Sequence, residues 1–425
     1  MGACAAVGLA LAAGASAAPV AFTVTLASDE PDATLADGIC DVDLATPGQQ
    51  CTLRAALQQA DDASDANTIA FDILGGGVHR IAPLSALPDI TQPATIDGYT
   101  QHGASVNTKG LAHGDNAALR IELNGRKLPT NTPVTGLTVG SGAGGTVIRG
   151  LVIDRFTTGI LFKANTVITG NFVGTDPTGT KARGNTFDGI FGFGGTRTTV
   201  GGPLPADRNL ISSNGDSGLT TNATVTVQGN LIGTASDGSS PLGNKFVFHL
   251  GAVELAGVGN IVGGAGNSAN VIAFNADKGI ALLNSGSPST FSRNRIFANG
   301  GLAIDLGEDG RTPNDPGDTD TGPNDFQNFP VLASAKSSRH HTKVNGRLDS
   351  TPNTQFTVEV FTSPRHVHGA KRFLGSIPVT TDATGAGTIN LTVRRIKQGS
   401  KVSATATSAS GATSELSPST KVKAR

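Results

Sequence analysis

Short apolar runs separated by Gly, Asn and Asp make up most of the chain. Residues 22–26 alternate apolar and polar positions, as a β-strand does. Apolar residues recur with a helical period only between positions 53 and 60, and Thr52 just before them can cap such a helix. The pattern therefore predicts one amphipathic helix near the N-terminus and short strands with turns downstream.

The strand-like runs repeat. The segment 170–175 (GNFVGT) returns as 229–234 (GNLIGT), and the triplet 209–211 (NLI) returns as 270–272 (NVI). Both pairs are separated by about 60 residues, and smaller turns are nested inside this period. Such spacing is typical of a repeat array rather than of a single globular core.

A right-handed parallel β-helix explains these repeats best. Each coil needs three short strands joined by sharp bends, which Gly, Asn and Asp allow at low cost. We expect about nine or ten coils between residues 68 and 306, with Asn side chains hydrogen-bonding from coil to coil at one bend. The alternative is a β-propeller, which has four strands per blade and usually Trp anchors, and this chain has no Trp.

Composition narrows the choice further. The chain has 425 residues, of which 57 are Gly and only 15% are charged. A helical bundle or coiled coil needs many more charged residues. General disorder is also disfavoured, because low charge accompanies many Val, Ile and Phe residues.

The two ends of the predicted coil stack differ from its middle. Residues 1–18 resemble a signal peptide with an A-x-A cleavage site, and residues 19–67 would form an N-terminal cap. We expect Cys40 and Cys51 to form a disulfide, as in exported proteins. An acidic linker at 307–330 leads to an immunoglobulin-like β-sandwich at 331–425, and its last predicted strand is 414–416. No segment after the leader is long and apolar enough to cross a membrane.

Charge is unevenly distributed. Residues 331–425 contain 14 Lys and Arg but only four acidic residues, whereas the chain as a whole has a net charge of −1. This density attracts polyanions at long range. The positions expected to contact a polyanion are Arg339, Lys343, Arg365, Lys371 and Arg372. Nucleic acid is disfavoured, because no groove-reading motif or stacking aromatic residues accompany the charge.

The motif CTLRAA at 51–56 resembles the sequence that names the CSLREA-domain family of secreted bacterial β-helix proteins. The segments 95–101 (TIDGYTQ) and 328–332 (NFPVL) are also similar to stretches common in that family. The resemblance implies a pectin-lyase-like fold and export to the cell surface or medium. It implies no particular reaction. Ala55 stands where the motif has Glu, so any ion pair from that position is absent.

Candidate catalytic residues are few. The acids Asp188, Asp216 and Asp277 obey the repeat, as turn residues do, so we expect them to be structural. Asp154, Arg155 and His249 interrupt the pattern and are candidates, and Glu254, five residues after His249, could form an acid/base pair with it. A polysaccharide hydrolase would need a carboxylate pair, and a lyase would need a base.

Carboxylates cluster in the acidic linker. Hard cations such as calcium take six to eight oxygen ligands from flexible loops. The expected calcium ligands are Asp315, Asp318, Asp320 and Asp325, although their spacing matches no EF-hand.

Together these features predict an exported or surface-bound monomer that binds anionic polysaccharide or envelope polymers in an adhesive or structural role. The alternative is a polysaccharide lyase or glycoside hydrolase that acts on acidic polysaccharide in the β-helix groove.

Overall fold

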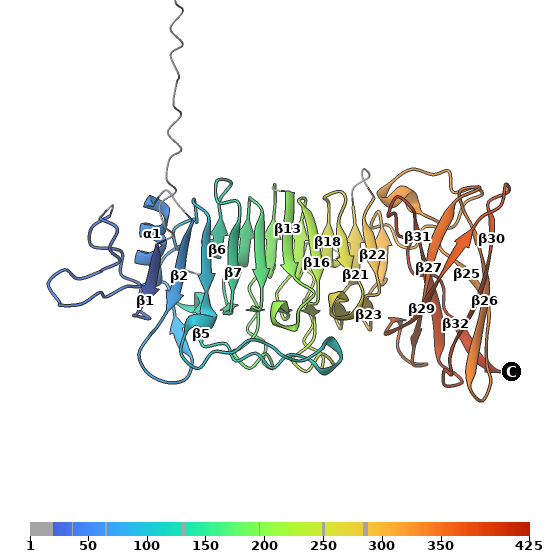
Figure 1. The fold of residues 1–425 in the computed structure, drawn as a ribbon, viewed down its shortest axis with the longest axis horizontal. Coiled ribbons are helices and arrows are strands. Elements are labelled where there is room, and N and C mark those ends of the chain that lie inside the picture. Colours follow the sequence, from blue (N-terminus) through green and yellow to red (C-terminus); the bar gives the residue numbers. More distant parts are fainter. Residues whose placement is uncertain are drawn as a thin grey trace, which may run out of the picture.

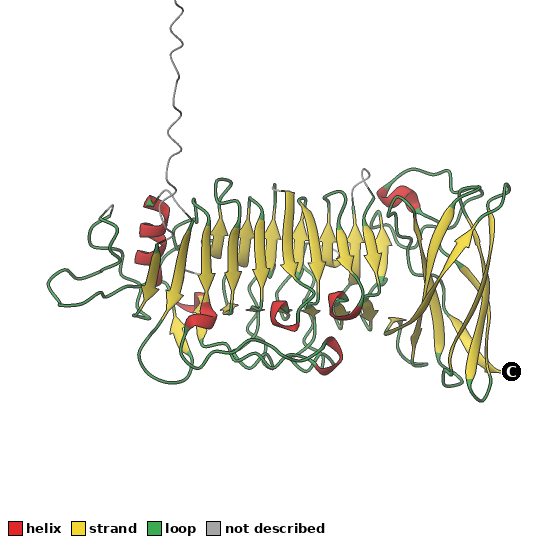
Figure 2. Cartoon of the chain, in the orientation of Figure 1, coloured by secondary structure: helices red, strands yellow, loops and turns green. Residues whose placement is uncertain are grey.

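The computed structural model describes residues 20–35, 37–63, 66–129, 132–194, 196–248, 251–283 and 288–425. The predicted signal peptide lies outside these residues. The molecule is elongated, with a column of stacked coils capped at one end by a helix and at the other by a separate β-domain (Figures 1 and 2). This is the parallel β-helix that the repeats predict. None of the described helices is long and apolar enough to span a bilayer.

Three sheets line the column, because each complete coil contributes one short strand to each sheet. The first sheet has nine strands, paired in parallel. They are β1 (Ala21–Val24), β2 (Asn67–Phe71), β4 (Ala94–Asp97), β7 (Thr146–Arg149), β10 (Thr166–Thr169), β13 (Thr196–Gly201), β16 (Thr224–Gln228), β19 (Ile261–Gly263) and β22 (Thr290–Ser292).

The second and third sheets complete each coil. The second comprises β3 (His79–Ile81), β5 (Ile121–Asn124), β8 (Leu151–Asp154), β11 (Phe172–Val173), β14 (Leu210–Ile211), β17 (Leu231–Ile232), β20 (Val271–Ala273) and β23 (Arg295–Phe297). The third comprises β6 (Thr135–Val139), β9 (Thr158–Phe162), β12 (Ile190–Gly192), β15 (Leu219–Thr221), β18 (Gly251–Leu255), β21 (Lys278–Leu282) and β24 (Ile304–Leu306).

Aliphatic residues form the interior by stacking in register from coil to coil. In the first sheet, Ile148 pairs with Ile168, which pairs with Val200, and the row continues in both directions. These side chains are fully buried. Each contributes roughly 1.5–3 kcal/mol relative to an exposed position, so the column is held together along its whole length.

Two asparagine ladders run beside this apolar stack. In one, each amide side chain donates to the next along Asn171, Asn209, Asn230, Asn270 and Asn294. In the other, the same contact links Asn185, Asn214, Asn244, Asn275 and Asn299. The predicted hydrogen bonding of Asn from coil to coil is confirmed, and it occurs at two bends.

The ladders also explain the 60-residue period. Successive members of the first ladder are 38, 21, 40 and 24 residues apart, whereas those of the second are 29, 30, 31 and 24 apart. The spacing alternates at the first bend but not at the second, and at both bends two successive steps span about 60 residues, so one sequence repeat corresponds to two coils.

The N-terminal end is covered by α1 (Leu53–Asp62), whose predicted cap is confirmed: the Thr52 hydroxyl accepts a hydrogen bond from the Ala55 N–H. Cys40 and Cys51 form a disulfide just before the helix, with their Cα atoms 5.1 Å apart. The coil stack begins earlier than the predicted boundary at residue 68, because β1 pairs in parallel with β2.

A long loop at residues 101–119, here called the strap, crosses the outer face of the second sheet. Figure 1 shows it as the blue-green loop along the lower edge of the coils. Its tip, the short helix η2 (Leu111–His113), lies near later coils, since the Leu111 N–H donates to Asn267 Oδ1 over 3.2 Å. Buried Arg208 holds the strap through 2.7 Å hydrogen bonds to the carbonyls of Lys109 and Gly114. Gly114 has φ +75°, and a Cβ there would lie 2.4 Å from the Ser236 carbonyl oxygen.

The C-terminal domain is a barrel-like, largely antiparallel sheet of seven strands. They are β25 (Val331–Ser337), β26 (His341–Asp349), β27 (Gln355–Ser363), β29 (Arg372–Thr380), β30 (Ala386–Arg394), β31 (Lys401–Ser408) and β32 (Thr420–Ala424). The immunoglobulin-like topology stays a prediction.

The predicted last strand at 414–416 is wrong. The hydroxyls of Ser414 and Ser417 accept the N–H groups of Ala406 and Ala404, where a regular ladder would use carbonyl oxygens. No regular strand forms there, and β32 takes its place in the sheet.

The C-terminal domain caps the coil stack. Strand β28 (Gly369–Ala370) pairs antiparallel with β23 and so ends the second sheet. On the first and third sheets, the Phe291 N–H donates to Thr413 Oγ1 and the Leu306 N–H donates to Glu415 Oε1. Side chains of the domain therefore satisfy edge groups that would otherwise pair with another chain.

Candidate polyanion-binding surface

Three lysines lie side by side across the C-terminal domain. Lys336 on β25 is in register with Lys343 on β26 and with Lys423 on β32, and all three side chains are exposed. We call these three residues the lysine row. Side chains directly opposite on neighbouring strands have Cβ atoms about 5 Å apart, so like charges there repel one another.

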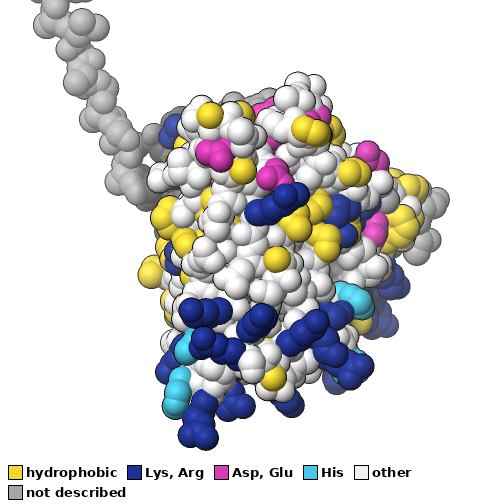
Figure 3. Space-filling view, turned by 90° about the vertical axis from the view of Figure 1, so that its right-hand side faces the viewer, with side chains coloured by type: hydrophobic (Ala, Val, Ile, Leu, Met, Phe, Trp, Pro, Cys, Tyr) yellow, Lys and Arg dark blue, Asp and Glu magenta, His cyan; other side chains and the backbone are white. Residues whose placement is uncertain are grey.

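No acidic residue of residues 331–425, all of which the structure describes, forms a salt bridge with this row. Asp349 pairs with Arg347 at 3.0 Å, and Asp382 accepts hydrogen bonds within its own turn. Glu359 and Glu415 are buried at the junction with the coils. Figure 3, which looks at this end of the molecule, shows Lys and Arg side chains gathered across its lower part.

A basic cleft lies where the coils, the strap and the C-terminal domain meet. Its volume is about 1010 Å³, and it is bounded by the strap tip, by coil residues near Asn267 and by the loop after β27. Its cationic lining residues are Arg293, Arg295, Lys371, Arg372 and Lys397.

Two cations of the cleft each lie over an aromatic ring across the junction between the coils and the C-terminal domain. The Arg293 guanidinium, from the coils, lies 5.0 Å from the centre of the Phe373 ring in the C-terminal domain. The Lys371 ammonium, from that domain, lies 4.6 Å from the centre of the Phe297 ring in the coils. Such contacts contribute about 0.5–2 kcal/mol each and hold both charges at the cleft wall.

Arg295 differs from Arg293 in its charge balance. Arg293 has a carboxylate neighbour, because its Nε lies 3.7 Å from Glu359 Oε1. Arg295 donates from Nε to the Lys371 carbonyl over 3.2 Å, and among the described residues no carboxylate forms a salt bridge with it. Burial lowers the pKa of Arg295 from its ordinary value. The cleft therefore contains a partly buried positive charge without a counter-charge.

The structure divides the predicted polyanion contacts between these two places. Lys371 and Arg372 line the cleft, and Lys343 belongs to the lysine row. Arg339 lies in the turn between β25 and β26, and Arg365 follows Pro364 at the cleft edge. The two places are adjacent, because the Arg395 N–H donates to the carbonyl of His340 beside that turn and Lys397 lines the cleft.

Sequence reasoning missed several basic residues. The alternation of Lys421, Val422 and Lys423 could have revealed β32 and with it one lysine of the row. Arg293 and Arg295 flank Asn294 of the first ladder, and no sequence signal places them against a distant domain. Ile396 and Lys397, which follow β30, also line the cleft.

The structure does not join Asp154 and Arg155 into a catalytic pair. Arg155 is exposed with a left-handed backbone (φ 62°), whereas Asp154 is fully buried. Asn124 Nδ2 donates to Asp154 Oδ1 over 2.5 Å and to Glu122 Oε1 over 3.2 Å. Arg183 covers this carboxylate pair through contacts with both acids. Burial, and then the Glu122 charge, raise the pKa of Asp154 to about 8.

The other candidate pair cannot be assembled from the described residues. His249 lies outside them. Glu254 is buried on β18, in register with Thr220 and Ala281 of the neighbouring coils. Of the acids expected to be structural, Asp216 accepts the N–H groups of Val247 and Phe248.

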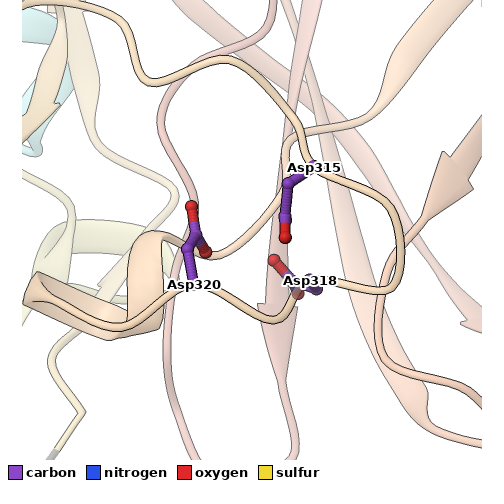
Figure 4. Close-up of side chains that lie close together, drawn as sticks. All are labelled: Asp315, Asp318 and Asp320. Carbon is purple, nitrogen blue, oxygen red and sulfur yellow. The ribbon is translucent and has the colours of Figure 1, made fainter.

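Three of the four predicted calcium ligands come together. Ligand oxygens of Asp315, Asp318 and Asp320 lie within 4.8 Å of one another (Figure 4), and Asp325 is not part of this group. Asp315 Oδ1 and Asp320 Oδ1 are buried without a hydrogen-bond partner. Asp318 accepts hydrogen bonds from Gln327 and Asn328, and burial raises its pKa to about 6.

No protein-family model and no curated protein matches this chain. Two similar solved structures are bacteriophage tailspikes. The enzymatically active domain of bacteriophage CBA120 tailspike protein 2 is 11% identical, with a TM-score of 0.27, over 86% of this chain and 73% of that chain. Tailspike protein gp49 of the Acinetobacter baumannii bacteriophage Fri1, a capsular polysaccharide depolymerase, is 9% identical, with a TM-score of 0.16, over 91% of this chain and 90% of that chain. Likenesses this distant do not assign a function to the chain.

Proposed function

We propose that this protein is exported and binds anionic polysaccharide or envelope polymers through the basic surface of its C-terminal domain, in an adhesive or structural role. The lysine row is the observation that carries the proposal. Three ammonium groups in register repel one another and lower the stability of the free domain. A polyanion laid across them removes that repulsion.

The spacing of the row favours a linear polymer over a single small anion. Neighbouring strands lie about 4.8 Å apart, so the row presents charges at regular intervals across β26, β25 and β32. The turn at Arg339 and the segment 395–397 extend the positive surface towards the cleft. A chain molecule can follow this path and contact several cations at once.

Nucleic acid fits the surface less well than an acidic polysaccharide. Single-stranded nucleic acids bind by stacking bases on aromatic side chains as well as by charge. Phe297 and Phe373, the rings beside the cleft, are already covered by Lys371 and Arg293. The disulfide is consistent with an exported protein, because such bonds persist in oxidising compartments.

The test uses point variants, because the C-terminal domain caps the coils and its deletion would expose their edge. A triple variant, Lys336→Gln with Lys343→Gln and Lys423→Gln, removes the row. The matched control neutralises three exposed lysines on the coils, with Lys127→Gln, Lys181→Gln and Lys245→Gln. Binding to polygalacturonate is measured at several salt concentrations.

We expect the row variant to bind at least tenfold more weakly at low salt. The slope of log affinity against log salt should fall by about 2–3, since each neutralised contact accounts for roughly 0.7–0.9. The control variant should keep the affinity and slope of the wild type. Equal losses in both triple variants, or none in either, would contradict a specific role for the row.

The rival function is a polysaccharide lyase or glycoside hydrolase acting in the β-helix groove. Its candidate Asp154 is buried beneath Arg183, which weakens the case. A screen of uronate polymers for new reducing ends, or for ultraviolet absorbance of unsaturated products, decides between the two functions. Turnover that Asp154→Asn abolishes would favour the enzyme.

A calcium ion at Asp315, Asp318 and Asp320 is part of the proposal. Three converging carboxylates with two unpartnered buried oxygens suit a hard cation. The site lies in the linker between the coils and the C-terminal domain, so its role would be to stiffen that connection.

A further inference from the structure

The basic cleft is built from three parts of the chain that are far apart in sequence. The strap supplies its tip, the last coils supply Asn267 and Arg295, and the C-terminal domain supplies Lys371 and Lys397. The cleft exists only where all three are docked. Its volume of about 1010 Å³ is at the upper end of the roughly 300–1,000 Å³ typical of ligand sites.

The cleft differs from the lysine row in how its charges are held. The lysines of the row are exposed on strand surfaces, whereas Arg295 is partly buried and its Nε is fixed by the Lys371 carbonyl. Because Nε already donates to this carbonyl, the N–H groups of Nη1 and Nη2 are the donors left for a ligand. A planar pair of N–H groups matches the two oxygens of a carboxylate.

We infer that the cleft binds a short segment of a carboxylated oligosaccharide, with one sugar carboxylate held by Arg295. The inference rests on the proposed function, and it names the part of the surface that recognises the chemistry of the polymer. Lys371 and Arg372 also line the cleft and balance further carboxylates. The lysine row attracts the polymer along its length, and the cleft selects for carboxylated sugars.

The remaining lining suits a sugar rather than a nucleotide. Ala112, exposed at the strap tip, offers apolar surface for the C–H face of a sugar ring. Asn267 accepts from the Leu111 N–H through Oδ1, and its amide nitrogen can donate to a sugar hydroxyl. Phe373, the phenylalanine of the lining, carries the Arg293 guanidinium on one face, so that face is closed to a stacking base.

Arg295→Gln tests the inference, with Arg295→Lys as a second variant that keeps the charge but loses the planar fork. Arg126→Gln, at an exposed position on an early coil, is the matched control. Affinities are measured for tetragalacturonate, for its methyl ester and for long polygalacturonate. Thermal melting confirms that each variant is folded.

We expect Arg295→Gln to weaken tetramer binding at least tenfold and Arg295→Lys to weaken it by a smaller factor. Binding of the long polymer should change less than threefold, because the row is intact. The methyl ester, which lacks the carboxylate charge, should bind the wild type at least tenfold more weakly than the free acid.

Two results would overturn the inference and leave the proposed function standing. One is long-polymer binding by the wild type without tetramer binding, and the other is tetramer binding that neither Arg295 variant nor esterification reduces. If the wild type binds neither tetramer nor long polymer, the proposed function itself fails. The esterification comparison needs no variant, so a variant that fails to fold does not block the test.

Discussion

The Lys371 ammonium nitrogen lies 4.6 Å from the centre of the Phe297 ring, and this contact joins the C-terminal domain to the last coil of the β-helix. Phe297 is on β23, which pairs with β28 just before Lys371. Gly369 in β28 has φ +91°, and a Cβ there would lie 2.3 Å from the Ile296 carbonyl oxygen. The close approach of the two backbones therefore depends on this glycine and brings the cation over the ring.

A double-mutant cycle on this pair should reveal its coupling. We expect Phe297→Leu and Lys371→Met to be less destabilising together than the sum of the single changes, by about 0.5–2 kcal/mol. Thermal denaturation of the four proteins measures this difference. The pair Lys163 and Phe193 on the coils, with 5.7 Å between the ammonium nitrogen and the centre of the exposed ring, is the control and should couple more weakly. Equal coupling in the two pairs would mean that the junction gains nothing from burial of the contact.

The asparagine ladders should be among the most sensitive positions in the coils. Asn230 is fully buried, donates to Asn270 Oδ1 and accepts from Asn209 Nδ2. Asn230→Ala leaves several buried groups unpaired, so we expect a loss of about 3–5 kcal/mol in the free energy of unfolding. Chemical denaturation measures it, and Asn390→Ala at an exposed strand position should cost less than about 0.5 kcal/mol.

Asn230→Asp separates hydrogen bonding from packing. Asp has nearly the same volume as Asn but cannot donate to Asn270 Oδ1, so two oxygens would face each other. We expect it to be at least as destabilising as Asn230→Ala. A well-tolerated Asp would show that packing, and not the ladder, determines stability here.

The elements that local chemistry dictates could be predicted from the sequence. Gly and Asn at fixed positions made the coils recognisable, since the bends need those residues wherever they occur. Thr52 revealed the helix in the same way. The prediction of a strand at 414–416 was wrong because serine hydroxyls replace backbone carbonyls as hydrogen-bond acceptors there. A pattern of alternating apolar and polar residues cannot reveal such a replacement.

The candidate site was harder to predict, because it depends on docking. Arg295 lines the cleft because β28 extends the second sheet into the C-terminal domain. The strap tip reaches Asn267 because Arg208 donates hydrogen bonds to backbone carbonyls of the strap. These contacts join residues roughly 75 to 155 positions apart. A local pattern carries no information about such distances. The composition of residues 331–425 did indicate a basic domain, and from it we predicted Lys343, Lys371 and Arg372 as polyanion contacts.

The buried carboxylate pair predicts a dependence of stability on pH. Burial and the neighbouring Glu122 raise the pKa of Asp154 from 3.8 to about 8. The folded protein therefore keeps a proton that the unfolded chain releases above about pH 4. Stability falls as pH rises from about 4 to 8, by at most about 1.4 kcal/mol per pH unit, and then levels off.

Asp154→Asn should remove this contribution, because its amide does not titrate and its oxygen can still accept from Asn124. Between pH 5 and pH 9, the wild type should lose more stability than the variant in denaturant titrations. Asp62→Asn, at an exposed position on α1, is the control and should follow the wild type. Parallel curves for the wild type and Asp154→Asn would contradict the raised pKa.

Calcium should stabilise the linker between the coils and the C-terminal domain. Asp315, Asp318 and Asp320 repel one another without a cation, and bound calcium would remove that repulsion. At a calcium concentration 100 times the dissociation constant, linkage gives about 2.7 kcal/mol of stabilisation. We expect the melting temperature to rise with calcium and to return on chelation. Because burial raises the pKa of Asp318 to about 6, protons compete for the site, and the rise should be larger at pH 8 than at pH 5.

Asp320→Asn should abolish the response to calcium, because it removes one converging carboxylate and its unpartnered oxygen. Asp325→Asn is the matched control: Asp325 lies in the same linker outside the group of three, so that variant should respond as the wild type does. Magnesium should act more weakly than calcium, since it demands a stricter octahedral geometry and keeps its water. A melting temperature unchanged by calcium in the wild type would show that the three carboxylates do not bind the ion. A response lost in Asp325→Asn but kept in Asp320→Asn would place calcium elsewhere in the linker.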